Sequence, residues 1–136
     1  MKAPRIILLD TNIILRFLRH DQPQHFGYVR KLFQEAEKGT IDCYIDPVVF
    51  AEVIWTLTSF YKVNRSEIST KLETLLVQKW MVNEHKQTLL SALHQYQETN
   101  LDYIDCWLLA VSEEKNIILE TFDVKLKKRQ KTVGAV

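Results

Sequence analysis

The 136-residue sequence has only three glycines, and it contains no glycine-rich phosphate-binding loop. Nucleotide-binding enzymes of the P-loop or Rossmann kind therefore have no support. Two cysteines, Cys43 and Cys106, are too few for a disulfide framework. Without paired histidines they do not form a structural zinc site either. We expect both thiols to be reduced and mostly buried, as in a cytoplasmic protein.

Long apolar runs and an excess of charge are also missing. Apolar runs such as 48–51 and 53–55, which are separated by Glu52, are far too short to cross a membrane. The apolar residues before Asp10 are too few for a signal peptide, which again predicts a cytoplasmic location. The formal net charge is +1, so global charge indicates nothing about nucleic acid.

The sequence does contain strand patterns that alternate with helical ones. Apolar runs typical of buried strands occur at residues 5–9 and 117–119, and residues 41–45 alternate apolar and polar residues as a strand does. Residues 80–82 and 131–136 are further candidates. Helical spacing of apolar residues is found at 11–18, 23–38, 47–61, 65–78, 86–97 and 103–114, with a last short helix after 123. This alternation predicts one α/β domain over residues 1–136, with a mostly parallel central sheet flanked by helices.

Two carboxylates follow expected strands. Asp10 comes directly after the first strand, and Asp123 comes shortly after the strand at 117–119. In open parallel sheets, ligands bind beyond the carboxyl ends of the strands, where both residues are expected. A helix cap explains either carboxylate equally well when it is taken alone.

Two further carboxylates lie among apolar residues of expected helices. Glu52 lies within Val48–Trp55, and Asp105 is followed by an apolar stretch. Because burial of an unpaired charge is costly, each needs either an ion pair or a functional role, and we favour the functional role. Asp102 lies one turn before Asp105, and we interpret it as a helix cap.

The combination indicates a metal site more strongly than any single member. Like charges about 4 Å apart repel by roughly 4 kcal/mol at an effective dielectric near 20, so a cluster needs protons or cations. Oxygen ligands without nearby histidine or cysteine favour Mg²⁺ or Mn²⁺ over zinc. Divalent ions held by carboxylates suit the hydrolysis of phosphodiesters.

Four segments of the chain resemble the PIN-domain family, and most closely the VapC-type toxins of toxin–antitoxin pairs. These segments are 8–16, 51–57, 102–110 and 121–123, and their order and spacing extend over almost the whole chain. The resemblance implies a quartet of acids that binds Mg²⁺ or Mn²⁺, with nearby polar residues that orient it. The acids would be Asp10, Glu52, Asp105 and Asp123, and the orienting residues Thr11, Asn12 and Thr121.

The resemblance also implies an activity and partners. Members of this family are endoribonucleases that cleave RNA and leave a 5′-phosphate, form homodimers and are neutralised by a small antitoxin protein. A catalytically silent PIN-fold binding module that acts through a protein partner is the alternative. A haloacid-dehalogenase-like phosphatase would need a second aspartate at position 12, which is Asn12. The basic run Lys125–Lys131 either contacts RNA phosphates or forms a solvated helix face.

Overall fold

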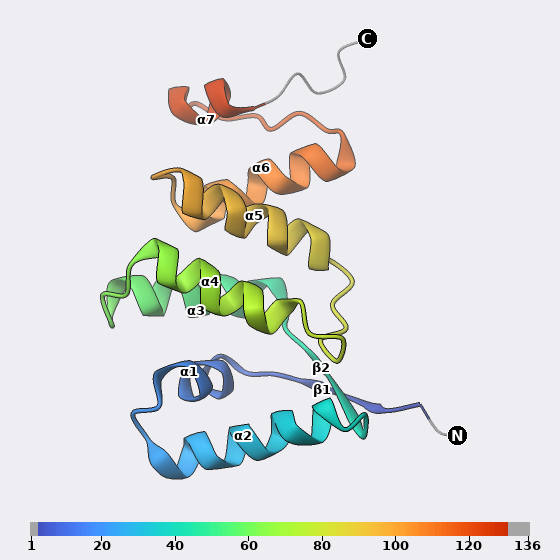
Figure 1. Cartoon of the computed structure of the whole chain (residues 1–136). Coiled ribbons are helices and arrows are strands. Elements are labelled where there is room, and N and C mark those ends of the chain that lie inside the picture. The colour runs from blue at the N-terminus through green and yellow to red at the C-terminus, as the bar shows by residue number, and fades with distance from the viewer. Residues whose placement is uncertain (1–2, 131–136) are drawn as a thin grey trace. The chain divides into compact units, whose positions relative to one another are not determined.

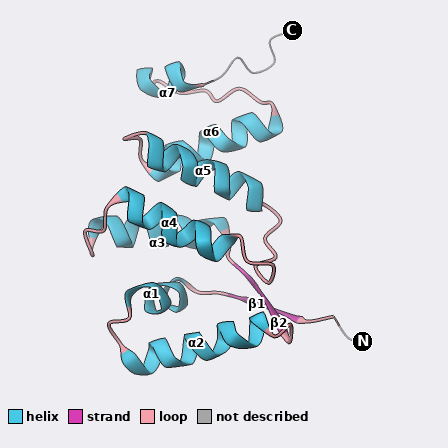
Figure 2. Ribbon diagram, viewed as in Figure 1, coloured by secondary structure: helices cyan, strands magenta, loops and turns pink. Residues whose placement is uncertain are grey.

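Helices make up most of the chain in the computed structural model, which describes residues 3–130 (Figures 1 and 2). The described residues form two units, which divide between Lys86 and Gln87. The first unit contains β1 (Arg5–Leu8), α1 (Thr11–Arg19), α2 (Pro23–Glu37), β2 (Ile41–Tyr44), α3 (Pro47–Ser59) and α4 (Arg65–Leu76). The second contains α5 (Lys86–Glu98), which begins at the boundary, α6 (Tyr103–Lys115) and α7 (Val124–Arg129).

The sheet of the first unit is parallel. β1 pairs with β2 in a register that places Ile7 opposite Cys43. Parallel strands cannot be joined by a tight turn, and α1 and α2 form the connection between these two. Met81 adds an isolated parallel bridge to Cys43, so the short strand expected at 80–82 is reduced to one residue.

The start of α3 follows from its sequence, because Asp46 caps the helix and Pro47 occupies its first turn. Its buried residues, Phe50, Val53 and Ile54 among them, lie at helical spacing. The opposite face of α3 is exposed, including Trp55 at 67%.

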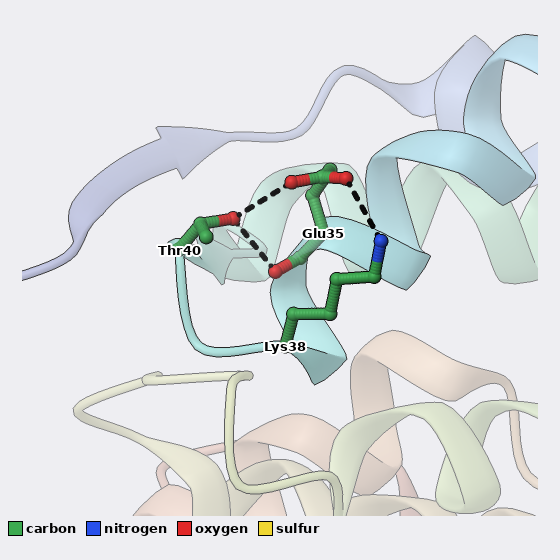
Figure 3. A network of polar contacts seen from close by, with 3 residues as sticks. All are labelled: Glu35, Lys38 and Thr40. Atoms are coloured by element: carbon green, nitrogen blue, oxygen red, sulfur yellow. Dashed lines mark hydrogen bonds and ion pairs between the residues drawn. The ribbon is translucent and has the colours of Figure 1, made fainter.

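A small polar network closes α2 before β2 (Figure 3). The Thr40 hydroxyl donates to the Glu35 backbone oxygen at 2.9 Å, and its oxygen lies 3.1 Å from the Glu35 carboxylate. Lys38 forms an ion pair with the same carboxylate at 3.5 Å. Gly39 has φ 87°, a left-handed conformation that glycine adopts without steric cost. The helix expected at 23–38 therefore ends close to its predicted boundary.

In the second unit, the strand expected at 117–119 is absent from the described residues. A side-chain amide replaces a neighbouring strand there. The Leu119 N–H donates to Gln130 Oε1 at 2.7 Å, and Gln130 Nε2 donates back to the Leu119 oxygen at 3.0 Å. The Ser112 hydroxyl donates to the Ile117 oxygen. The Ile117 N–H also donates to the Ser112 backbone oxygen at 3.1 Å, so two side chains and one backbone bond hold the segment, and Ile118 is exposed.

The α/β class is confirmed, with a sheet that is small: within residues 3–130 it has two strands and one bridging residue. The edge strand expected at 131–136 lies outside the described residues. No helix of the described chain is long and apolar enough to span a membrane.

Candidate active site

Asp10 joins β1 to α1. Its side chain accepts a hydrogen bond from the Thr11 N–H at 2.8 Å, so it caps the helix. The preceding residue, Leu9, is buried and donates its N–H to the Tyr44 oxygen at 2.9 Å, which fixes the end of the strand. Asp10 itself is exposed. The cap uses one carboxylate oxygen in this contact and leaves the carboxylate open to solvent.

The polar residues that follow Asp10 differ in exposure. Thr11 is buried, with only 7% of its surface exposed. Asn12 is exposed and lines a small cavity beside α1. Ile14 and Leu15 bury the opposite side of the helix. The helix is thus anchored by its apolar residues and holds Asp10 and Asn12 at its open amino end.

Glu52 differs from the sequence expectation. It was expected to be buried, but it is exposed, at helical spacing with the exposed residues Val48 and Trp55. Because α3 turns Phe50 and Val53 into the core, position 52 falls on the other side of the helix. Its carboxylate is hydrated and needs no buried partner.

Asp105 lies in the first turn of α6 and is half-buried. Its pKa is raised above the usual value, first by burial and then by repulsion from the carboxylates of Asp102 and Asp123. Asp102 occupies the N-cap position of α6, but its side chain makes no capping hydrogen bond. Three carboxylates of the second unit therefore influence one another electrostatically.

Asp123 is held in two ways. Its carboxylate caps α7 by accepting from the Leu126 N–H at 3.0 Å, and its own N–H donates to the Thr121 hydroxyl at 3.1 Å. Thr121 therefore fixes the backbone that presents Asp123. The capping interpretation is confirmed for this residue, as it is for Asp10, and it leaves a catalytic role untested.

The donor chemistry of the four acids fits a hard divalent cation. Asp10, Glu52, Asp105 and Asp123 offer oxygen atoms alone, and none forms an ion pair within its own unit in the described residues. No three histidine, cysteine, aspartate or glutamate side chains gather as a metal-binding group in the part of the chain described. Two of the four belong to each unit, so the quartet stays a prediction.

Two features near these residues were missed from the sequence. Asn83 is buried and forms two hydrogen bonds with the backbone of Ile45, directly before the cap of α3. Arg16 and Tyr28 line the same small cavity as Asn12. A single polar residue in a connector carries no periodic signal, so only the structure reveals such contacts.

Comparison with known proteins shows the family of the chain. Residues 7–131 match the PIN domain model, so the chain belongs to the PIN-domain family. It is similar to a VapC ribonuclease of Aquifex aeolicus (strain VF5), with 27% identity over 127 residues, which cover 93% of this chain and 91% of the relative. No solved structure matches the chain. The resemblance read from four sequence segments is confirmed.

Proposed function

We propose that the chain is a metal-dependent endoribonuclease, the toxin of a type II toxin–antitoxin pair. One observation carries this proposal: a VapC ribonuclease is similar to the chain along 91% of the relative's own length, within a PIN-domain match over residues 7–131. We propose that residues 1–136 act as one nuclease domain.

Four carboxylates would hold Mg²⁺ or Mn²⁺. Asp10 and Asp105 are the main ligands in this proposal, and Glu52 and Asp123 complete the site directly or through water. When bound, such an ion lowers the pKa of a coordinated water and offsets negative charge on the scissile phosphate. Support comes from the donor chemistry, because carboxylate oxygens are the ligands these ions prefer.

The residues of the chain would position this chemistry. The Thr11 N–H holds the Asp10 carboxylate in one orientation, and Thr121 orients the segment that presents Asp123. Asn12 is exposed two residues after Asp10, where its amide is free to contact the substrate or a coordinated water. Burial, and then repulsion from Asp102 and Asp123, raises the pKa of Asp105, and a cation beside this carboxylate would offset the repulsion.

The partners in this proposal are an RNA substrate, a small antitoxin protein and a second copy of the chain. The similarity to the VapC ribonuclease of Aquifex aeolicus supports the RNA substrate and the toxin class. A cytoplasmic location accords with the two free cysteines, Cys43 and Cys106, which are both buried.

The test compares two aspartates that cap helices in the same way. Asp10→Asn keeps the shape and a capping oxygen but removes the charge, and we expect RNA cleavage to fall by ~100-fold or more while the fold is retained. Asp46→Asn changes the equivalent cap of α3, outside the proposed quartet, and should leave cleavage near the parent level. Equal cleavage by Asp10→Asn and the parent would refute the assignment of the site.

A further inference from the structure

A small cavity lies beside α1 and the start of α2, two helices joined by a short connection in Figure 1. Its volume is about 250 Å³, and its lining includes Asn12, Arg16, Gln22, His25 and Tyr28. This volume is below the roughly 300–1,000 Å³ of pockets that enclose whole drug-sized ligands. The cavity therefore suits a single ring system rather than a large ligand.

The lining combines an aromatic ring with amide groups. Tyr28 is 67% exposed, so one side of its ring is open for stacking. Asn12 and Gln22 are both exposed and supply donors and acceptors of the kind that pair with base edges. Aromatic stacking joined to such hydrogen bonds is how proteins recognise unpaired RNA bases.

Arg16 gives the cavity a fixed positive group. Its guanidinium donates to the Asp21 carboxylate at 3.2 Å. The pKa of Arg16 is raised, first by a hydrogen bond with Tyr61 and also by Asp21, so it stays charged. A guanidinium has five N–H donors, and these contacts leave others for a phosphate oxygen.

The cavity is also close in the chain to a proposed catalytic carboxylate. Asn12 lines it and lies two residues after Asp10, whose carboxylate is held at the amino end of the same helix. A base seated here would place the adjoining sugar-phosphate chain near that end of α1. Each of these groups belongs to the first unit.

We propose that this cavity, the Tyr28 pocket, binds one unpaired base of single-stranded RNA next to the bond that is cleaved. The proposal rests on the proposed ribonuclease function and adds a substrate-binding site to it. Tyr28 is the stacking residue, Asn12 and Gln22 contact the base edge, and Arg16 contacts a neighbouring phosphate.

Binding to a non-cleaving protein tests this directly. In the Asp10→Asn background, fluorescence anisotropy measures the affinity for a short, fluorescein-labelled single-stranded RNA of mixed sequence. Tyr28→Ala should weaken binding about tenfold, whereas Tyr28→Phe, which keeps the ring, should bind like the background protein. Arg30→Gln removes an exposed arginine of α2 outside the pocket. It is the control for a general loss of positive charge, and it should bind RNA like the background protein.

The outcomes separate this proposal from the proposed function. Unchanged RNA affinity in Tyr28→Ala would overturn the pocket, even if the parent protein cleaves RNA. If Tyr28→Ala leaves RNA affinity unchanged but weakens the binding of a protein partner, the RNA pocket is overturned and Tyr28 belongs to the surface that binds that partner. If the parent does not cleave RNA but Tyr28→Ala still weakens RNA binding, the pocket stands and the nuclease proposal fails. Absence of RNA binding by the background protein and by the parent would overturn the pocket.

Discussion

Asp105 is a carboxylate placed where its charge is disfavoured. It is half-buried on α6, and Asp102 and Asp123 add negative charge around it. Repulsion of this kind raises the free energy of the folded chain, since the same charges lie farther apart after unfolding. Proteins keep such arrangements where function requires them, at some cost in stability.

Replacement of Asp105 should therefore stabilise the protein when no divalent ion is present. We expect Asp105→Asn to raise the free energy of unfolding by up to ~1 kcal/mol in chelator, because the group is partly solvated and its charge is screened. The same variant should gain less stability than the parent when Mg²⁺ or Mn²⁺ is added. Urea unfolding with and without the ion measures both effects.

An exposed carboxylate on the same helix provides the control for this prediction. Glu113→Gln removes one charge from α6 at an exposed position, and its unfolding should follow the parent in both conditions. If Asp105→Asn is less stable than the parent in chelator, repulsion does not govern this carboxylate, and its role is structural.

Sequence reasoning at the residue scale identified the acids but not all of their surroundings. Asp10 and Asp123 end up as helix caps, which was one of the two interpretations kept for each. Glu52 was placed in the core because its neighbours are apolar, yet it is exposed. A helix that is apolar on most sides gives no period from which the buried face can be chosen.

At the scale of elements, one side chain holds the short link between β2 and α3. The Ile45 N–H donates to Asn83 Oδ1 at 3.0 Å, and Asn83 Nδ2 donates to the Ile45 oxygen at 2.5 Å. These bonds continue the pattern of the Met81 bridge by one more step along the edge of the sheet. Asn83 thereby fixes the backbone directly before Asp46, the cap of the helix that carries Glu52.

Loss of this amide should destabilise the first unit. Asn83→Ala leaves a buried N–H and a buried carbonyl of Ile45 without partners, which costs about 2–3 kcal/mol of unfolding free energy. Asn100→Ala, at an exposed asparagine, should change stability by less than about 0.5 kcal/mol. Chemical denaturation of the two variants decides the point, and equal stabilities would show that water replaces the amide.

Element boundaries were predictable where the sequence carries local signals. Pro23 and Pro47 begin helices as expected, and Gly39 follows the end of α2. The apolar run at 117–119 has the composition of a strand, but its hydrogen bonds go to the side chains of Ser112 and Gln130 and to the Ser112 backbone oxygen instead. Composition shows that a segment favours extended backbone, whereas its hydrogen-bonding partner depends on residues outside the segment.

At the scale of the whole molecule, the sequence predicts the family better than it predicts the sheet. The PIN-domain match spans residues 7–131, in agreement with the four segments from which the resemblance was inferred. The central sheet was expected to be larger than the two strands and one bridge found in residues 3–130. The order and spacing of the four segments therefore carried more information about the family than the strand patterns carried about the sheet.

The net charge of +1 gives the molecule no general attraction for RNA. In the present account, substrate binding depends on local groups such as the Tyr28 pocket, and catalysis depends on a cation held by carboxylates. Substrate binding and catalysis therefore each depend on one local site and not on the charge of the whole molecule. Removal of the cation should abolish cleavage without unfolding the chain.

The measurement that tests the central claim most directly is RNA cleavage by the parent protein in chelator and after addition of Mg²⁺ or Mn²⁺. We predict no cleavage in chelator, recovery with either ion, and a 5′-phosphate on one product, with the fold monitored by circular dichroism throughout. Cleavage that is unaffected by the chelator would contradict the four-carboxylate mechanism. A folded protein that cleaves no RNA with either ion would contradict the nuclease proposal and favour the catalytically silent binding module.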